Sequence, residues 1–168
     1  MMLSGCDYSR EYRDFLTEMD EQVIPYRKSK IIHFIDDNGK TSTMEVKKDK
    51  TFWKEDIEYD TRVVWECRKL HLSSEQCDLQ FDVEIESLHW YESPNVYVQT
   101  SSGDGFLVYY DIRGLLETHD SLEINHHIYY DVAVANESNG KGSQLYYNTK
   151  YGILQVTQGD KNIFTLIP

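Results

Sequence analysis

Hydrophobic and polar residues alternate along most of this chain, and a period of two is typical of β-strands that bury one face. The clearest run is 76–90, where Leu79, Phe81, Val83 and Ile85 alternate with amide and acidic side chains. Other strand-like runs are 30–35, 41–46, 63–72, 95–100, 105–112, 122–134, 144–148, 152–157 and 162–167. The pattern predicts nine or ten strands in all.

The connections between these runs contain turn residues. Asn38-Gly39 lies between two of the runs and predicts a hairpin with a type I′ turn, which needs positive φ at both central residues. Gln158–Lys161 predicts a second hairpin. Residues 47–60 are highly charged and predict a loop or a short helix, and the polar segment 113–120 predicts one helical turn.

The N-terminal residues 7–24 follow a helical period instead. Their apolar side chains recur at steps of three and four, which indicates an amphipathic helix that Pro25 would end: Tyr8, Tyr12, Phe15, Leu16, Met19 and Val23. We expect residues 7–28 to form this helix or a tether, and residues 29–168 to form an antiparallel β domain. Since helices and strands do not alternate, the fold class is mainly β, an antiparallel sheet arranged as a sandwich or open barrel with one N-terminal helix.

Three cysteines are present: Cys6, Cys67 and Cys77. If the runs on either side of Leu72 form a hairpin centred near that residue, Cys67 and Cys77 project from the same face, and we expect a disulfide between them. The alternative is a pair of buried free thiols. Cys67 is a poor candidate nucleophile, because His71 would lie on the other face of its strand.

The net charge is −12 with a pI near 4.8, which disfavours nucleic acid as a partner. The acidity indicates a solvated surface, with a cationic partner or a divalent ion as the alternative. The chain has no apolar run of the roughly 20 residues that a membrane-spanning helix requires.

The sequence carries no recognisable catalytic or nucleotide-binding motif. His126 and His127 are adjacent, so in a strand they would point to opposite faces and could not easily share a metal ion. With 29 acidic residues, no carboxylate pair can be chosen for glycosidase chemistry. We therefore expect no catalytic residue, no metal site and no cofactor.

Aromatic residues are frequent among the strands and suggest a stacking surface for a glycan or a protein partner. The candidates are Trp65, Trp90, Tyr91, Tyr109 and Tyr129. Paired tyrosines such as Tyr129-Tyr130 more often stabilise the sheet itself, with one ring in the core and one over a neighbouring strand.

Leu3-Ser4-Gly5-Cys6 resembles the lipobox of bacterial lipoproteins. The resemblance implies that residues 1–6 are the remnant of a signal peptide, that cleavage precedes Cys6, and that a lipid on its sulfur anchors the chain in the membrane of the cell envelope. The alternative is that Cys6 is an ordinary cysteine of a cytosolic protein.

The run 125–166 is similar to the endings of small envelope lipoproteins from Bacteroides-like bacteria. The matching residues are Tyr129, Asp131, Val132, Tyr146, Tyr147, Asn148, Tyr151, Gly152, Ile153, Leu154, Phe164 and Leu166. This resemblance implies the same compartment and no activity.

We expect a non-enzymatic envelope lipoprotein that binds a partner or ligand through its β domain. One alternative is an immunity-type or inhibitor lipoprotein whose acidic surface meets a basic toxin or enzyme. The other is a small sugar-active hydrolase, which would require convergent carboxylates in a pocket.

Overall fold

A computed structural model describes residues 10–76, 80–87, 95–100, 105–109, 117–137, 142–159 and 161–168. The fold is mainly β, as expected, with one 12-stranded sheet in the order β7-β6-β5-β4-β3-β2-β12-β11-β10-β9-β8 and β1 beside β4. All neighbours on this path are antiparallel. The elements are β1 (Arg10–Asp14), α1 (Glu18–Gln22), β2 (Ile31–Ile35), β3 (Thr41–Glu58), β4 (Thr61–Ser74), β5 (Gln80–Glu86), β6 (Asn95–Thr100), β7 (Gly105–Tyr109), β8 (Glu117–Ile124), β9 (His127–Asn136), β10 (Ser143–Asn148), β11 (Gly152–Gln158) and β12 (Lys161–Ile167).

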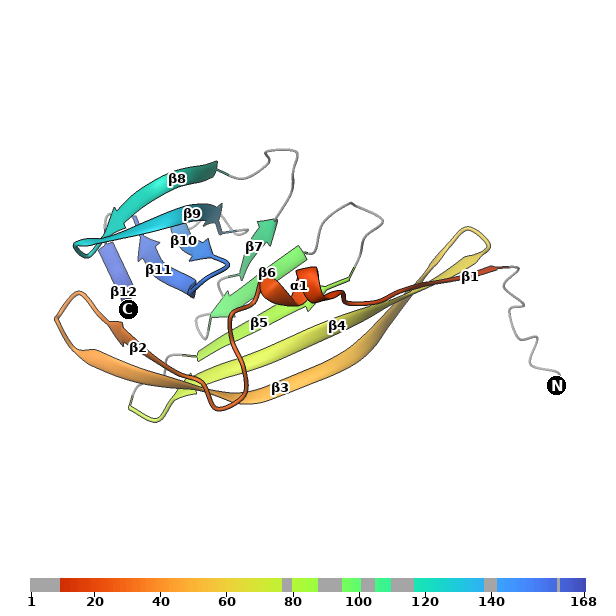
Figure 1. The fold of residues 1–168 in the computed structure, drawn as a ribbon, viewed down its shortest axis with the longest axis horizontal. Helices are drawn as coiled ribbons and strands as arrows, with labels where there is room; N and C mark the ends of the chain where they lie inside the picture. Colours follow the sequence, from red (N-terminus) through yellow and green to blue (C-terminus); the bar gives the residue numbers. More distant parts are fainter. Residues whose placement is uncertain are drawn as a thin grey trace.

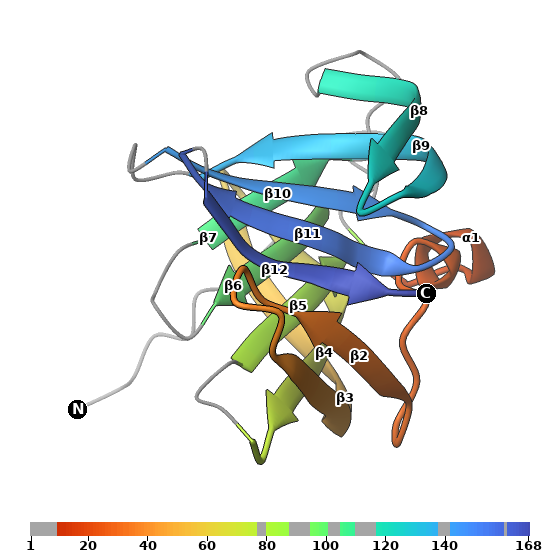
Figure 2. The same cartoon turned by 90° about the vertical axis from the view of Figure 1, so that its left-hand side faces the viewer.

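The sheet curls, so that β9–β11 lie across from β5–β7 and its inner face encloses the core (Figure 2). Alternate residues of β5 and β6 point inward and are fully buried, among them Phe81, Val83 and Val98. β2 pairs with β12 and joins the two halves of the chain. The far ends of the sheet approach one another at a bridge between Phe106 and Glu137.

The β3–β4 hairpin is longer than the rest of the sheet. β5 pairs with β4 only from Cys67 to Ser73, so residues 61–66 of β4 extend beyond it. β1 runs parallel to β4 along Thr61–Trp65 and occupies the edge that β5 leaves open. We call β1, residues 53–58 and residues 61–66 the arm, which projects from the body of the molecule (Figure 1).

The predicted helix over residues 7–24 is wrong for Arg10–Asp14, which form strand β1. A helix of five residues follows, Glu18–Gln22, and Thr17 caps it: the Thr17 hydroxyl accepts from Asp20 N at 3.2 Å, and Asp20 Oδ2 accepts from Thr17 N at 2.7 Å. The unpaired edge of β4 explains the difference, because hydrogen bonds to a neighbouring strand override a local helical pattern.

The prediction of a loop or short helix over residues 47–60 is also wrong. These residues continue β3 and pair with β4 as far as Glu58, which lies opposite Thr61. The charges fit a strand because most of them lie on exposed positions. Likewise, residues 117–120, expected in a helical turn, belong to β8.

The hairpin predicted around Asn38-Gly39 is confirmed, but its turn is not type I′. Of the two central residues only Gly39 has positive φ, and the Asp36 carboxylate accepts from the backbone N–H groups of Asn38 and Lys40. A two-residue turn with positive φ at both positions occurs at Asn125-His126, where Ile124 pairs with His127. The single strand predicted over 122–134 is therefore two strands.

The segment after α1 closes one end of the core. Tyr26 is buried, and its hydroxyl accepts from Ile153 N at 2.5 Å. The hydroxyl lies against Gly152, which has a φ of +84°; a Cβ at Gly152 would lie 2.1 Å from it. Tyr147 donates to Val23 O at 2.6 Å. Tyr147 and Gly152 of the C-terminal run thus have structural roles here.

Candidate functional site

Strand β5 supplies the polar centre of the site. Its residues alternate strictly: Phe81, Val83 and Ile85 are buried in the core, whereas Asp82, Glu84 and Glu86 point to the outer face. The sequence pattern predicted this alternation, and the structure confirms it for Gln80–Glu86. Since core burial fixes the register of β5, it also fixes the spacing of the carboxylates.

The strands on one side of β5 place basic side chains opposite these carboxylates. Asp82 lies 2.7 Å from His71 Nδ1 and 3.1 Å from Lys69 Nζ. Lys54 of β3 donates to both Glu84, at 2.5 Å, and Glu86. Each of the three β5 carboxylates on the outer face is therefore paired within the sheet.

A hollow of about 370 Å³ lies over these residues on the outer face. Strand β6 adds Tyr97 and Gln99 to its wall. Tyr97 lies over Gly105 of β7, where a Cβ would come within 2.2 Å of the tyrosine hydroxyl. The full lining is Lys54, Lys69, Asp82, Glu84, Glu86, Tyr97 and Gln99.

The ion pairs determine the protonation states of the charged side chains that line the hollow. Burial lowers the pKa of Lys54, but hydrogen bonds to Glu84 and Glu86 outweigh burial and raise it above its usual value. Burial raises the pKa of Asp82, but hydrogen bonds from His71 and Lys69 outweigh burial and lower it. The lysine and the aspartate therefore both stay charged at neutral pH.

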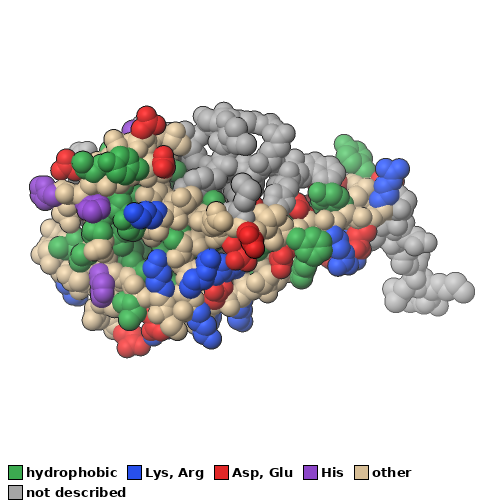
Figure 3. Space-filling model, viewed as in Figure 1, with side chains coloured by type: hydrophobic (Ala, Val, Ile, Leu, Met, Phe, Trp, Pro, Cys, Tyr) green, Lys and Arg blue, Asp and Glu red, His purple; other side chains and the backbone are tan. Residues whose placement is uncertain are grey.

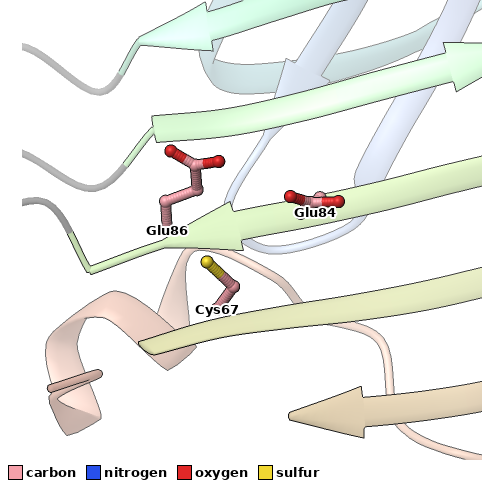
Figure 4. Close-up of side chains that lie close together, drawn as sticks. All are labelled: Cys67, Glu84 and Glu86. Carbon is pink, nitrogen blue, oxygen red and sulfur yellow. The ribbon is translucent and has the colours of Figure 1, made fainter. Parts of the chain in front are cut away.

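Cys67 lies beside Glu84 and Glu86 (Figure 4). One ligand atom of each residue lies within 4.8 Å of the others, so together they could offer a metal ion three ligands. Burial and the charge of Glu86 raise the pKa of the Cys67 thiol to about 12, so it is protonated at neutral pH. With Lys54 bound to both carboxylates, the arrangement favours an ion-pair network over a metal centre.

The structure corrects the geometry on which the Cys67–Cys77 disulfide depended. Leu72 pairs with Phe81, so the hairpin is centred well beyond Leu72. Cys67 is a buried free thiol opposite Glu86, and Cys77 lies outside the described residues. This register removes the geometric support for the disulfide.

Of the predicted binding aromatics, the two whose side chains the structure describes, Trp65 and Tyr129, do not lie together. Trp65 is half-buried on the outer face, opposite Lys54. Tyr109 ends β7, opposite Asn95. Trp90 and Tyr91, like the lipidation candidate Cys6, lie outside the described residues.

Tyr129 cannot serve as a surface aromatic, because it is 1% exposed. Its ring lies 4.7 Å from the ring of His127 and packs edge-on against Tyr151. The bulky ring fills the core under the β8–β9 hairpin.

None of the seven residues that line the hollow was among the candidate site residues predicted from the sequence. Tyr97 and Gln99 alternate with the apolar Val96 and Val98, so the period of β6 could have placed them beside the carboxylates of β5. Lys54 had no such signal, because its part of the chain was interpreted as a loop or helix.

No family model, curated protein or solved structure matches this chain. Among the described residues, no helix has the length and apolar character needed to cross a membrane.

Proposed function

We propose that this protein is a non-enzymatic lipoprotein of the bacterial cell envelope, anchored through a lipid on Cys6, that binds a ligand on the outer face of its β domain. The lipobox-like residues Leu3–Cys6 support the proposed location in the cell envelope. The curl of the sheet and the Phe106–Glu137 bridge support an open barrel as the finer architecture.

The hollow over β3–β6 is the observation that carries the binding proposal. It combines carboxylates, ammonium groups and the Gln99 amide with the ring and hydroxyl of Tyr97 in one depression. Hydroxyl-rich ligands need donors and acceptors at close spacing together with aromatic surface. A neutral glycan is therefore the ligand class that the hollow fits best.

The charge arrangement favours a neutral ligand over a basic protein. Lys54, Lys69 and His71 already pair with the three carboxylates of β5. A basic toxin would have to displace these side chains, so the immunity-type alternative gains no support from this face. The protonated Cys67 is a weak nucleophile, which supports a binding role over a covalent catalytic one.

The proposed lipidation and envelope location are tested by expressing the gene in its host and measuring the mass of the N-terminal peptide, with Cys6→Ala as the control. We expect a lipid-sized mass increment and membrane fractionation, and both should be lost in Cys6→Ala. An unmodified Cys6 in the soluble fraction would contradict the envelope proposal.

The binding role is tested by screening neutral and acidic oligosaccharides against the purified chain, followed by titration calorimetry. Gln99→Ala should weaken binding of a neutral glycan by about tenfold, the value of one hydrogen bond. Gln144→Ala is the matched control, since Gln144 lies on β10, outside the hollow, and should bind as the parent does. Equal affinity of the two variants, or binding of basic proteins alone, would overturn the glycan proposal.

A further inference from the structure

The tip of the arm is built around an aromatic residue that does not pack on the described fold. Tyr59 occupies the turn between β3 and β4 with a φ of 58°, and its side chain is fully exposed. Positive φ is unfavourable for a bulky residue, and turns of this kind usually contain glycine or asparagine. The tyrosine at this position therefore strains the backbone, and its side chain contributes no packing to the described fold.

Other apolar side chains lead toward this tip. Ile57 is 52% exposed and lies on the same face of β3 as Trp53, which is also exposed. Phe15 packs edge-on against Trp53 at 5.2 Å. Hydrophobic side chains are visible along the projecting arm (Figure 3), far from the enclosed core.

The chain places Cys6 within reach of the same tip. Because β1 runs parallel to β4, Arg10 lies opposite Thr61, the residue at which β4 leaves the turn. Cys6 precedes Arg10 by four residues, and four residues span about 14 Å at most when fully extended. A lipid on Cys6 would therefore hold the arm tip close to the membrane surface.

We propose that the tip of the arm contacts the bilayer that holds the anchor, with Ile57 and Tyr59 entering the headgroup region. The inference rests on the proposed lipidation of Cys6. Tyrosine and isoleucine suit this role, since an amphipathic ring prefers the membrane interface and an aliphatic side chain prefers the acyl boundary. A lipid on Cys6 anchors the chain at one point only, and a second contact of this kind orients the protein on the surface.

The charge of the tip defines the lipid surface that it fits. Residues 55–62 carry four acidic side chains, Glu55, Asp56, Glu58 and Asp60, against the single base Arg62. Anionic headgroups repel such a tip over about a Debye length, whereas zwitterionic headgroups do not. The partner that the tip fits is therefore a zwitterionic lipid surface.

The test couples the purified chain through Cys6 to maleimide-bearing lipid in phosphatidylcholine vesicles, in a Cys77→Ser background. Coupling supplies the anchor chemically, so the result does not depend on lipidation in the cell, which the mass measurement tests separately. Tyr59→Trp introduces a reporter at the tip, and acyl-chain-brominated phosphatidylcholine quenches indoles that enter the bilayer. We expect the emission added by this tryptophan to be lost in brominated vesicles.

Tyr130→Trp is the matched control. Tyr130 is 66% exposed, follows the 55% exposed Ile128 by two residues as Tyr59 follows Ile57, and lies in β9 at the opposite end of the molecule (Figure 1). Its added emission should be unchanged by brominated lipid. Equal quenching of the two reporters, or quenching of neither, would overturn the proposal.

Two further measurements separate the tip contact from general proximity to the membrane. Ile57→Ser in the Tyr59→Trp chain should reduce the quenching, because it removes the second inserted side chain. Replacing part of the phosphatidylcholine with phosphatidylglycerol should reduce it at low salt and restore it at high salt. Quenching that rises on anionic vesicles at low salt would contradict the assigned lipid chemistry.

Discussion

The β3–β4 hairpin lies partly in the body of the molecule and partly in the arm, and its inner-face side chains are buried in the first part and largely exposed in the second. In the body, the inner face of β4 meets the opposing strands and buries Leu70 and Leu72 completely. In the arm, the same strand carries Arg62 on that face, and its partner β3 exposes Trp53 and Ile57. Backbone pairing continues unbroken from one part to the other, so hydrogen bonds extend the hairpin. The local stability of each part depends on how much apolar surface it buries. Trp53 and Ile57 of the arm are therefore exposed at positions whose counterparts in the body are buried.

The largest expected effect lies at Gly152 in the body. Gly152→Ala introduces a Cβ 2.1 Å from the Tyr26 hydroxyl at a residue with φ +84°. Overpacking and backbone strain together should lower the free energy of unfolding by about 4 kcal/mol, measured by urea denaturation.

Gly142→Ala is the control for strain alone. Gly142 has a similar φ of +80°, and a Cβ added there would meet no atom within 4 Å, so we expect a loss of about 1–2 kcal/mol. Equal losses for the two variants would show that contact with Tyr26 does not constrain the body.

The second effect concerns the junction between body and arm, where Arg68 is buried. Its Nε and Nη2 both donate to the Asp49 carboxylate at 2.8 Å, and its Nη2 also donates to Tyr26 O. Asp49→Asn leaves the buried guanidinium without its main counter-charge and should cost about 3 kcal/mol.

This loss should depend on pH. The hydrogen bond from Arg68 is the main cause that lowers the pKa of Asp49 below its usual value. The stabilisation is therefore present above the unfolded pKa of about 3.9 and is lost as pH falls through the lower folded pKa. The stability difference between parent and Asp49→Asn should be constant from pH 7 to 5 and shrink below pH 4; a constant difference down to pH 2 would contradict the assignment.

The third effect isolates one hydrogen bond of the body. Tyr26→Phe leaves the buried Ile153 N–H without its acceptor at 2.5 Å and should cost about 2 kcal/mol in urea denaturation. Tyr59→Phe at the arm tip removes the same hydroxyl from an exposed ring and should change stability by less than about 0.5 kcal/mol. A comparable loss of stability at both sites would contradict the difference in burial between body and arm.

The smallest effect has the opposite sign. Tyr59→Gly relieves positive φ at a fully exposed position and should stabilise the chain by up to about 1 kcal/mol in thermal unfolding. Tyr130→Gly, at a position of β9 without positive φ, should instead destabilise it by about the same amount. Destabilisation at both positions would show that the Tyr59 ring contributes to the fold.

The sequence pattern predicted those strands whose conformation depends on residues close to them in the sequence. The alternation in β5 and the three closing strands β10–β12 were expected from the sequence, because a period of two and short turns define them. The arm was not, because β1 and the outer end of β3 owe their conformation to β4. Tyr12 fits a helical period with Phe15 and Leu16, and the open edge of β4 explains why Arg10–Asp14 form a strand instead.

The candidate site was predictable to the same extent. The carboxylates of β5 follow from its alternation, and the residues of β6 from theirs. The pairing of Lys54 with Glu84 and Glu86 depends on the length of the hairpin, which no pattern within residues 47–60 indicated. The burial of Tyr129 depends on the turn at Asn125-His126, which reverses a run that otherwise looked continuous.

The pairing of β2 with β12 has a consequence for how the protein acquires its structure. β2 forms near the start of the chain, and its second neighbour is the last strand of the sequence. The β2–β3 hairpin therefore keeps an unsatisfied edge until residues 161–167 have been synthesised, and the core cannot be completed before then. Contacts so distant in sequence slow folding and leave strand edges exposed to aggregation. We expect such a chain to depend on chaperones until its final strand is available.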